Sequence, residues 1–173
     1  LQETIRDCTS NLERYRFNDA ALALYDFVWH QFCDWYVEYA KEDLYGEDAA
    51  RREQVLAIMH YVFSSSPRMW HPMMPFVTEE LWHAMGYGTD EESIMVAAWP
   101  EPVPAETMDA WSLSREAIEY VEQKHELIRA ARTLRSDYDI PPSRKVTYRI
   151  KPKREELAER LREDESTLKA LLR

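Results

Sequence analysis

Residues 16–41 read RFNDAALALYDFVWHQFCDWYVEYAK, and this stretch decides the fold. Apolar and aromatic side chains recur in it every three or four residues, as they do along one face of an α-helix. Further apolar residues lie between these positions, so the apolar arc is wider than the single stripe of a surface helix. Such a helix is typical of the centre of a bundle, where neighbouring helices cover two or more of its sides. We therefore predict one long helix whose rings are mostly core residues.

Helical patterns lie on both sides of this stretch. Apolar periodicity predicts helices over residues 1–15, 48–66, 114–136 and 154–173. The helix over 48–66 is expected to turn five apolar residues inwards: Val55, Ile58, Met59, Val62 and Phe63. The helix over 114–136 is expected to bury Ile118, Val121, Ile128 and Ala131. The chain has only 3 glycines, and leucine, alanine, glutamate and arginine are plentiful. This composition favours an all-helical fold.

Prolines divide the remaining segments. Pro67, Pro72 and Pro75 exclude an uninterrupted straight helix there, and Thr78 fits the start of a short helix that ends near Gly86. Residues 87–113 are expected to be irregular, with SIMVAAWP at 93–100 as an extended stretch within them.

The C-terminal part has a different pattern. Pro141 and Pro142 end the long helix, and KVTYRI at 145–150 alternates apolar and polar side chains, as a strand does. No partner for this strand is visible. We therefore predict an all-α helix bundle over residues 1–140, followed by a small, truncated β-α appendage over residues 141–173.

Several classes of protein are excluded. No apolar run approaches the roughly 20 residues of a membrane span, and Cys8 and Cys33 are too few for a disulfide framework or a metal site. There is no glycine-rich phosphate loop, metal-ligand cluster or nucleophile motif. The chain starts at Leu1 without a signal-peptide pattern. We expect a cytoplasmic, non-catalytic binding module without cofactor or metal, cut from a longer protein.

The charge distribution suggests what is bound. Residues 1–100 hold 7 Lys and Arg against 17 Asp and Glu, whereas residues 127–154 hold 9 against 2. This basic run is either a solvated face or an anion-binding patch on an acidic body. Arg129 and Arg132 share one face of the predicted helix and Arg135 lies further round it, while Arg144 and Lys145 follow the turn. Guanidinium groups bind phosphates and stack on bases, so these cations are candidate RNA-binding residues.

Arg16 and Phe17 precede the long helix and have two possible roles. Asn18 is a good helix N-cap, so Phe17 could pack on Leu22 as a hydrophobic staple. Alternatively, Phe17 stacks on an unpaired RNA base beside Arg16, because sequence-specific RNA readers stack splayed bases on aromatic side chains.

Four motifs carry a resemblance that covers essentially all of the chain. They are the stretch at 16–41, HPMMPFVTEELW, SIMVAAWP and IRAARTLRSDYDIPPSRKV, in that order. Together they resemble the anticodon-binding domain, and the start of the following segment, of the valyl-tRNA synthetase family of class I aminoacyl-tRNA synthetases. MPFVTEELW is similar to the leucyl, isoleucyl and methionyl relatives as well, and KEDLYG resembles the isoleucyl branch. FCDWY and SIM…WP resemble the valyl branch more closely.

The resemblance implies a function. Enzymes of this family ligate valine to tRNA(Val) using ATP and Mg²⁺ in a catalytic domain, and an editing domain hydrolyses mischarged products. Neither their HIGH-like nor their KMSKS-like motif occurs here, so we expect this chain to bind the tRNA anticodon loop without catalysing. We also expect a monomer that contacts the rest of its polypeptide, and the resemblance implies that residues 141–173 lead to a coiled-coil arm. It places Arg16 and Phe17 at the helix entrance and Arg129, Arg132 and Arg135 on the basic helix. The alternatives are the same domain of an isoleucyl or leucyl relative, or a helical protein–protein interaction module.

Overall fold

The computed structural model describes residues 1–89, 92–141 and 143–172. Its described residues form helices and connecting loops without any strand, which confirms the all-α prediction. The chain divides into two compact units, Leu1–Val103 and Pro104–Arg173, which we call unit 1 and unit 2. No helix within the described ranges is long and apolar enough to cross a membrane.

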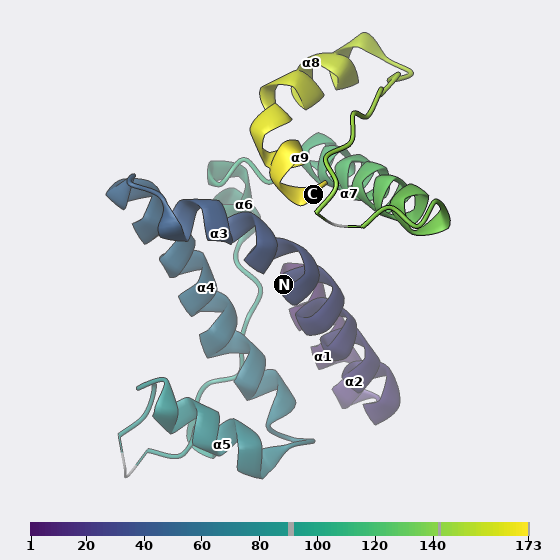
Figure 1. Cartoon of the computed structure of the whole chain (residues 1–173). Helices are drawn as coiled ribbons and strands as arrows, with labels where there is room; N and C mark the ends of the chain where they lie inside the picture. Colours follow the sequence, from purple (N-terminus) through teal and green to yellow (C-terminus); the bar gives the residue numbers. More distant parts are fainter. Residues whose placement is uncertain (90–91, 142, 173) are drawn as a thin grey trace. The chain divides into compact units, whose positions relative to one another are not determined.

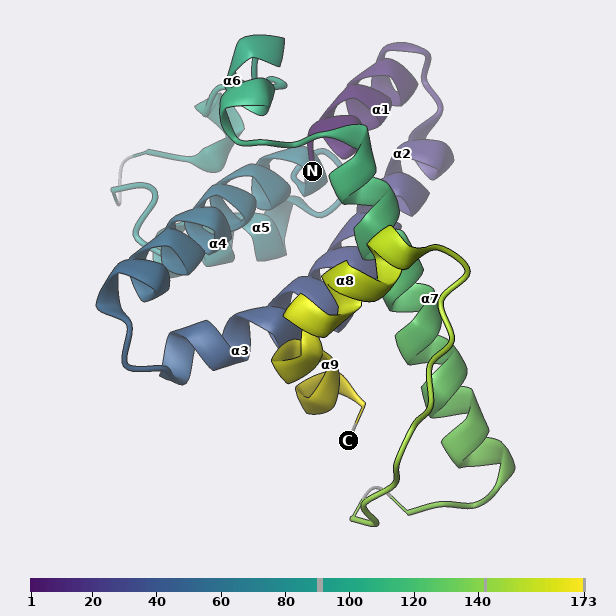
Figure 2. The same ribbon diagram turned by 90° about the horizontal axis from the view of Figure 1, so that it is seen from above.

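Unit 1 begins with a helical hairpin. Helix α1 (Gln2–Glu13) and helix α2 (Phe17–Tyr25) run antiparallel and side by side (Figures 1 and 2). The predicted long helix is confirmed, because α2 continues without a break through η1 (Asp26–Tyr36) into α3 (Val37–Tyr45).

The middle of this long helix is a π-helix, which we did not predict. Its i→i+5 hydrogen bonds place residues five apart on one side. Phe27 and Phe32 are both buried, with ring centroids 6.5 Å apart. In an α-helix, the 100° step would turn them roughly 140° apart. The π-helix therefore lets both rings reach the same core, where Tyr36 stacks on Phe32.

Helix α4 (Ala49–Trp70) starts at Asp48, whose carboxylate accepts a hydrogen bond from the Arg51 backbone N–H. It was expected to end before Pro67, but it continues to Trp70 with this proline inside. Proline removes a single backbone donor, and in the same turn the Arg68 guanidinium donates to the Ser64 carbonyl oxygen at 2.7 Å. The interruption predicted by the prolines comes only after residue 70.

Helix α5 (Pro75–Ala84) begins three residues before the predicted start at Thr78. Proline suits the first helical position because its missing N–H would have no partner there. The helix ends at Ala84, and Gly86 follows the C-cap residue Met85 with a φ of +73°, a conformation that glycine adopts without steric cost. The stretch at 93–100 is not fully extended as predicted, because the short 3₁₀ helix η2 (Ile94–Val96) lies in it.

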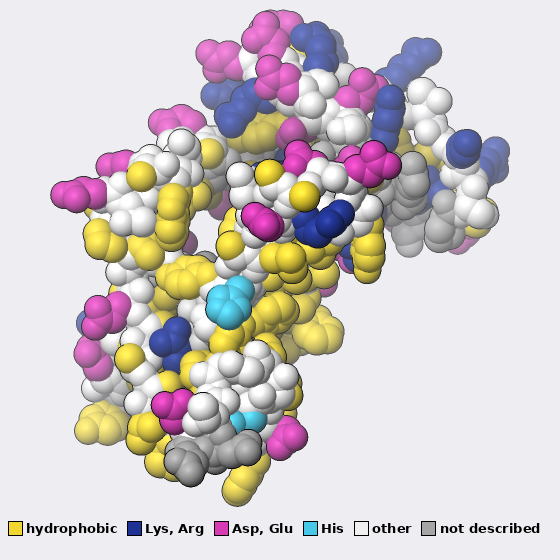
Figure 3. All heavy atoms as spheres, turned by 90° about the vertical axis from the view of Figure 1, so that its left-hand side faces the viewer, with side chains coloured by type: hydrophobic (Ala, Val, Ile, Leu, Met, Phe, Trp, Pro, Cys, Tyr) yellow, Lys and Arg dark blue, Asp and Glu magenta, His cyan; other side chains and the backbone are white. Residues whose placement is uncertain are grey.

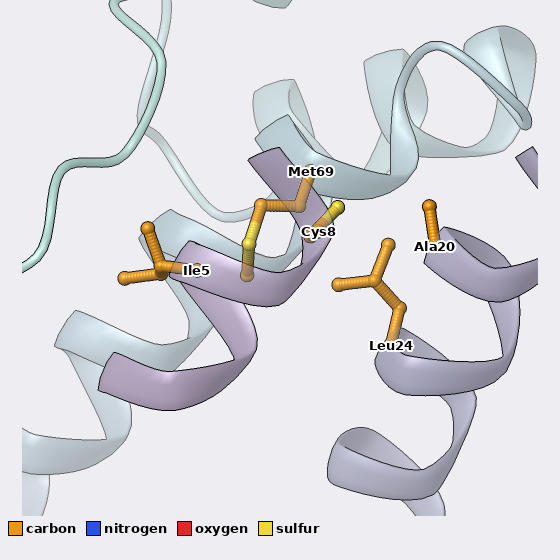
Figure 4. Close-up of a cluster of buried hydrophobic side chains, with 5 residues drawn as sticks. All are labelled: Ile5, Cys8, Ala20, Leu24 and Met69. Carbon is orange, nitrogen blue, oxygen red and sulfur yellow. The ribbon is translucent and has the colours of Figure 1, made fainter. Parts of the chain in front are cut away.

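The core of unit 1 is built where α1, α2 and α4 meet. Figure 4 shows Ile5, Cys8, Ala20, Leu24 and Met69 pointing towards one another, and none of them is exposed to solvent. The expected inward face of α4 is partly wrong. Val55 and Val62 are buried, but Ile58 and Phe63 are exposed to 48% and 39%.

Unit 2 contains helices α6 (Ala105–Ala110), α7 (Arg115–Asp137), α8 (Glu155–Glu163) and α9 (Glu165–Leu171). Helix α7 confirms the helix predicted over 114–136. Ile128 and Ala131 are buried in it as expected, whereas Ile118 and Val121 are largely exposed. Residues 145–150 form no strand in the described structure, because a ladder needs a second strand. The β-α appendage is therefore not confirmed.

The predicted last helix is interrupted at Asp164, where α8 ends. The Asp164 carboxylate lies 2.6 Å from the Tyr120 hydroxyl and 2.8 Å from the Lys124 amino group, both on α7. The guanidinium of Arg160 covers the Tyr120 ring at 4.1 Å. These contacts fasten the corner between α8 and α9 to α7.

The functional boundary that we predicted at residue 140 differs from the division of the structure after Val103, and it stays a prediction. Pro142, which was expected to help end the long helix, lies outside the described residues.

Candidate nucleic-acid interface

The first predicted site lies in the turn between α1 and α2, which we call the entrance turn (residues 14–17). Arg16, not Asn18, is the N-cap of α2, and Phe17 is the first residue of the helix. The staple is therefore not formed: Phe17 and Leu22 are exposed to 55% and 58%. The Phe17 ring instead contacts Tyr15 edge to face, with centroids 6.3 Å apart.

The Arg16 guanidinium is held in place by a neighbour on α2. Its Nε donates to the Asp19 carboxylate at 2.6 Å, and both side chains are well exposed. An exposed ion pair of this kind contributes at most about 1 kcal/mol. The printed bond uses Nε alone, so the guanidinium keeps N–H groups on its terminal nitrogens that can donate to a further acceptor.

The second predicted site lies in unit 2, on α7 and the basic segment that follows it (residues 143–154). Arg135 is only 8% exposed. Its Nη2 donates to the Pro141 carbonyl oxygen at 2.7 Å and to the Arg144 carbonyl oxygen at 3.0 Å. The side chain therefore fixes the path of the loop after α7, and the exposed Arg144 and Lys145 follow directly from this anchor.

Arg129 and Arg132 lie on the helix predicted for them, α7, and both are exposed. Arg132 also donates to the Leu171 carbonyl oxygen, at 3.2 Å from Nη2, and so satisfies an acceptor at the end of α9. Burial, followed by the positive charges of Arg129 and Lys124, lowers the pKa of His125 to about 4. This histidine is therefore neutral near pH 7 and adds no charge to the basic surface.

A groove of about 950 Å³ separates the basic segment from α8 and α9. Its apolar lining includes Ala158, Leu161 and Leu168. Its basic lining residues are Arg135, Arg144, Lys145, Arg162 and Lys169, against the single carboxylate of Glu165. The geometry therefore combines an apolar floor with cations, as suits a ligand with an apolar part and negative charge.

The structure brings Arg135, Arg144 and Lys145 together around one groove, and places Arg129 and Arg132 on the preceding helix. Arg16 and Phe17 belong to unit 1. The sequence analysis missed Tyr15, which is 82% exposed at the entrance turn. Its position between Arg14 and Arg16 was a visible signal, since aromatic residues beside cations are typical of single-stranded RNA sites.

No group of three or more His, Cys, Asp or Glu side chains is arranged to hold a metal ion within the described part of the chain. The Glu79 carboxylate accepts a hydrogen bond from the Ser93 hydroxyl at 2.9 Å, and its other oxygen lies 3.0 Å from Nε2 of His83. The carboxylate thus stands between the hydroxyl and the imidazole, and ties η2 to α5.

Comparison with known families gives the family of this chain. The family model described as the anticodon-binding domain of tRNA ligase matches residues 1–150. The chain belongs to this family.

Several valine–tRNA ligases are similar to this anticodon-binding domain. That of Bacillus licheniformis is 41% identical over 166 residues, which are 96% of this chain and 18% of the relative. The valine–tRNA ligase of Bacillus subtilis is 40% identical, again over 96% of this chain and 18% of the relative. That of Syntrophotalea carbinolica is 38% identical over 94% of this chain and 17% of the relative. The chain thus spans less than a fifth of the length of these relatives. They agree with the valyl branch indicated by the sequence motifs.

Proposed function

We propose that this domain binds the anticodon arm of a valine tRNA as the RNA-reading part of a valine–tRNA ligase. The observation that carries the proposal is the set of exposed cations on α7 and the basic segment, in a chain that has a net charge of −10. Ligation of valine, with ATP and Mg²⁺, would belong to another part of that enzyme, and this domain would only bind and orient the RNA.

Phosphate contacts are assigned to Arg129, Arg132, Arg144 and Lys145, which are all exposed. Each cation that neutralises an RNA phosphate releases condensed counterions, so affinity depends on salt. Arg135 has a different role in this proposal. Because it is buried against the Pro141 and Arg144 carbonyls, it acts as a positioning residue for the two cations that follow.

Base contacts are assigned to the entrance turn. Phe17 offers an exposed ring at the start of α2, directly after the exposed Arg16 in the chain. An unpaired base that stacks on an aromatic side chain gains about 1–3 kcal/mol. Single-stranded loops present such bases, whereas double-stranded stems hide them. The anticodon loop is therefore the part of the tRNA that suits this turn.

The test is a fluorescence anisotropy titration with a hairpin RNA that has the sequence of a valine anticodon arm, at two salt concentrations. We expect saturable binding that weakens as salt rises. Arg144→Ala and Arg129→Ala should each weaken binding and make the logarithmic dependence of affinity on salt shallower by about 0.7–0.9. Arg51→Ala is the matched control, because Arg51 is an exposed arginine in unit 1 that is paired with Asp43.

A protein-contact role for unit 1 is a second candidate. Figure 3 shows apolar side chains over the exposed face formed by α4 and α5. The exposed apolar residues of α4 and α5 include Ile58, Phe76 and Leu81, at 48%, 91% and 45%. The partner in this proposal is the rest of the same polypeptide, in which the domain would sit as a monomer. If the hairpin RNA does not bind but these residues become protected from hydrogen exchange in a full-length ligase, protein contact is the better description.

A further inference from the structure

Tyr15 holds an unfavourable backbone conformation at the end of α1. Its φ is +57°, in the left-handed region that favours glycine and disfavours residues with a Cβ. The turn is nevertheless well formed. The Arg16 N–H donates to the Asn11 carbonyl oxygen at 2.8 Å, and the Tyr15 N–H donates to that of Leu12 at 3.0 Å. These two bonds define a Schellman motif, whose left-handed position is usually glycine or asparagine.

The Tyr15 ring does not offset the energetic cost of this backbone conformation by packing in the core. It is 82% exposed and lies outside the buried clusters of unit 1. The Phe17 ring meets it edge to face at an interplanar angle of 70°. Phe17 is less exposed, at 55%. The contact therefore orients the tyrosine ring and leaves most of its surface open to solvent.

The surroundings of this ring suit a negatively charged ligand with flat groups. Arg14 and Arg16 flank Tyr15 in the chain and are both exposed, although residues 1–100 hold only 7 basic residues in all. An aromatic face beside two cations is the combination that single-stranded nucleic acid recognises, because bases stack on the ring while phosphates pair with the cations. An apolar protein segment would gain nothing from these two charges.

We propose that Tyr15 is an RNA-contacting residue, whose ring stacks on an unpaired base of the anticodon loop while Phe17 supports it edge to face. This inference rests on the proposed function and adds to it the residue that carries the base. Stacking needs the ring and not the hydroxyl group. The ring is available for such a contact because Tyr15 is 82% exposed.

The test compares two substitutions at this position. Tyr15→Phe keeps the ring, and Tyr15→Asn removes it but tolerates the left-handed conformation. Tyr45→Asn is the control, because Tyr45 is an equally exposed tyrosine of unit 1, at 87%. The probe is the valine anticodon-arm hairpin with 2-aminopurine at one loop position in turn, whose fluorescence falls on stacking. Thermal unfolding of each variant is measured in parallel.

We expect Tyr15→Asn to weaken binding roughly five-fold or more, the low end for one base–aromatic stack, and to abolish the fluorescence change at one loop position. Tyr15→Phe and Tyr45→Asn should bind like the unaltered chain, and Tyr15→Asn should unfold at the same or a higher temperature. Unchanged binding of Tyr15→Asn, or an equal loss for Tyr45→Asn, would overturn the inference while the proposed function stands. If the unaltered chain does not bind the hairpin, both are overturned.

Discussion

Replacing Arg135 by glutamine tests whether a buried arginine acts on RNA only through the loop it holds. The Arg135 side chain is 8% exposed, and its Nη2 bonds to the carbonyl oxygens of Pro141 and Arg144. Glutamine is shorter and uncharged, so it cannot reach both acceptors. On our account, the variant keeps every exposed cation but loses the anchor that places Arg144 and Lys145.

The size of the effect follows from these two hydrogen bonds. A bond from a charged donor to a carbonyl contributes about 1.5–3 kcal/mol. Pro141 and Arg144 are exposed residues, so water can replace the lost donor, and the lower value applies to each bond. The ordered loop should therefore lose about 3 kcal/mol in total. RNA affinity can fall only by what the two cations contribute, and we expect a loss of about tenfold.

The assay is a double-mutant cycle in the anisotropy titration. Arg135→Gln is measured in the unaltered chain and in the Arg144→Ala, Lys145→Ala background. If Arg135 acts through the loop, its substitution should change affinity less than about twofold in that background. The control is Arg129→Gln, which should weaken binding equally in both. An equal loss for Arg135→Gln in the two backgrounds would mean that Arg135 contacts RNA directly, and our reasoning would be wrong.

Three further predictions concern stability. Asp164→Asn removes the carboxylate that pairs with Lys124, whose side chain is 10% exposed. Urea unfolding should show that unit 2 is destabilised by about 2 kcal/mol, less than for a fully buried pair because solvent screens the partly exposed aspartate. An unchanged free energy of unfolding would exclude the anchoring role. Because burial lowers the pKa of His125 to about 4 on folding, unit 2 should be most stable above pH 6.5 and lose stability as the pH falls from 6.5 towards 4. A His125→Gln variant whose stability depends on pH like that of the unaltered chain would refute this. Met69→Ala opens a cavity in a fully buried cluster and should cost unit 1 about 2–5 kcal/mol, whereas Met95→Ala, at a 74% exposed position, should cost less than about 0.5 kcal/mol.

The helices could be predicted because their apolar periodicity is strong. Helix α7 was placed within a residue at each end, since Ser114 is a good N-cap and accepts a hydrogen bond from the Ala117 N–H. The π-helix could not be predicted, because spacings of three and four suit an α-helix and only packing brings Phe27 and Phe32 to one side. Alternation at 145–150 suggested a strand, but a strand depends on a partner that local pattern cannot supply.

The candidate site could likewise be predicted from the sequence only in part. The charge run marked Arg129, Arg144 and Lys145 correctly as exposed residues. It could not distinguish Arg135, because burial of an arginine depends on carbonyl acceptors supplied by the fold. The backbone conformation of Tyr15 was hidden for a related reason, since a positive φ at a tyrosine contradicts its local preference and arises only from the turn.

The most direct test of the central claim is a competition between two hairpin RNAs for the unaltered chain at one salt concentration. One hairpin has the valine anticodon arm, and the other differs only in its anticodon bases. Our account predicts that the valine hairpin binds at least about tenfold more tightly, since one good base contact discriminates by about 1–3 kcal/mol. Equal affinity for the two hairpins would contradict it, because a basic surface without base reading does not distinguish them.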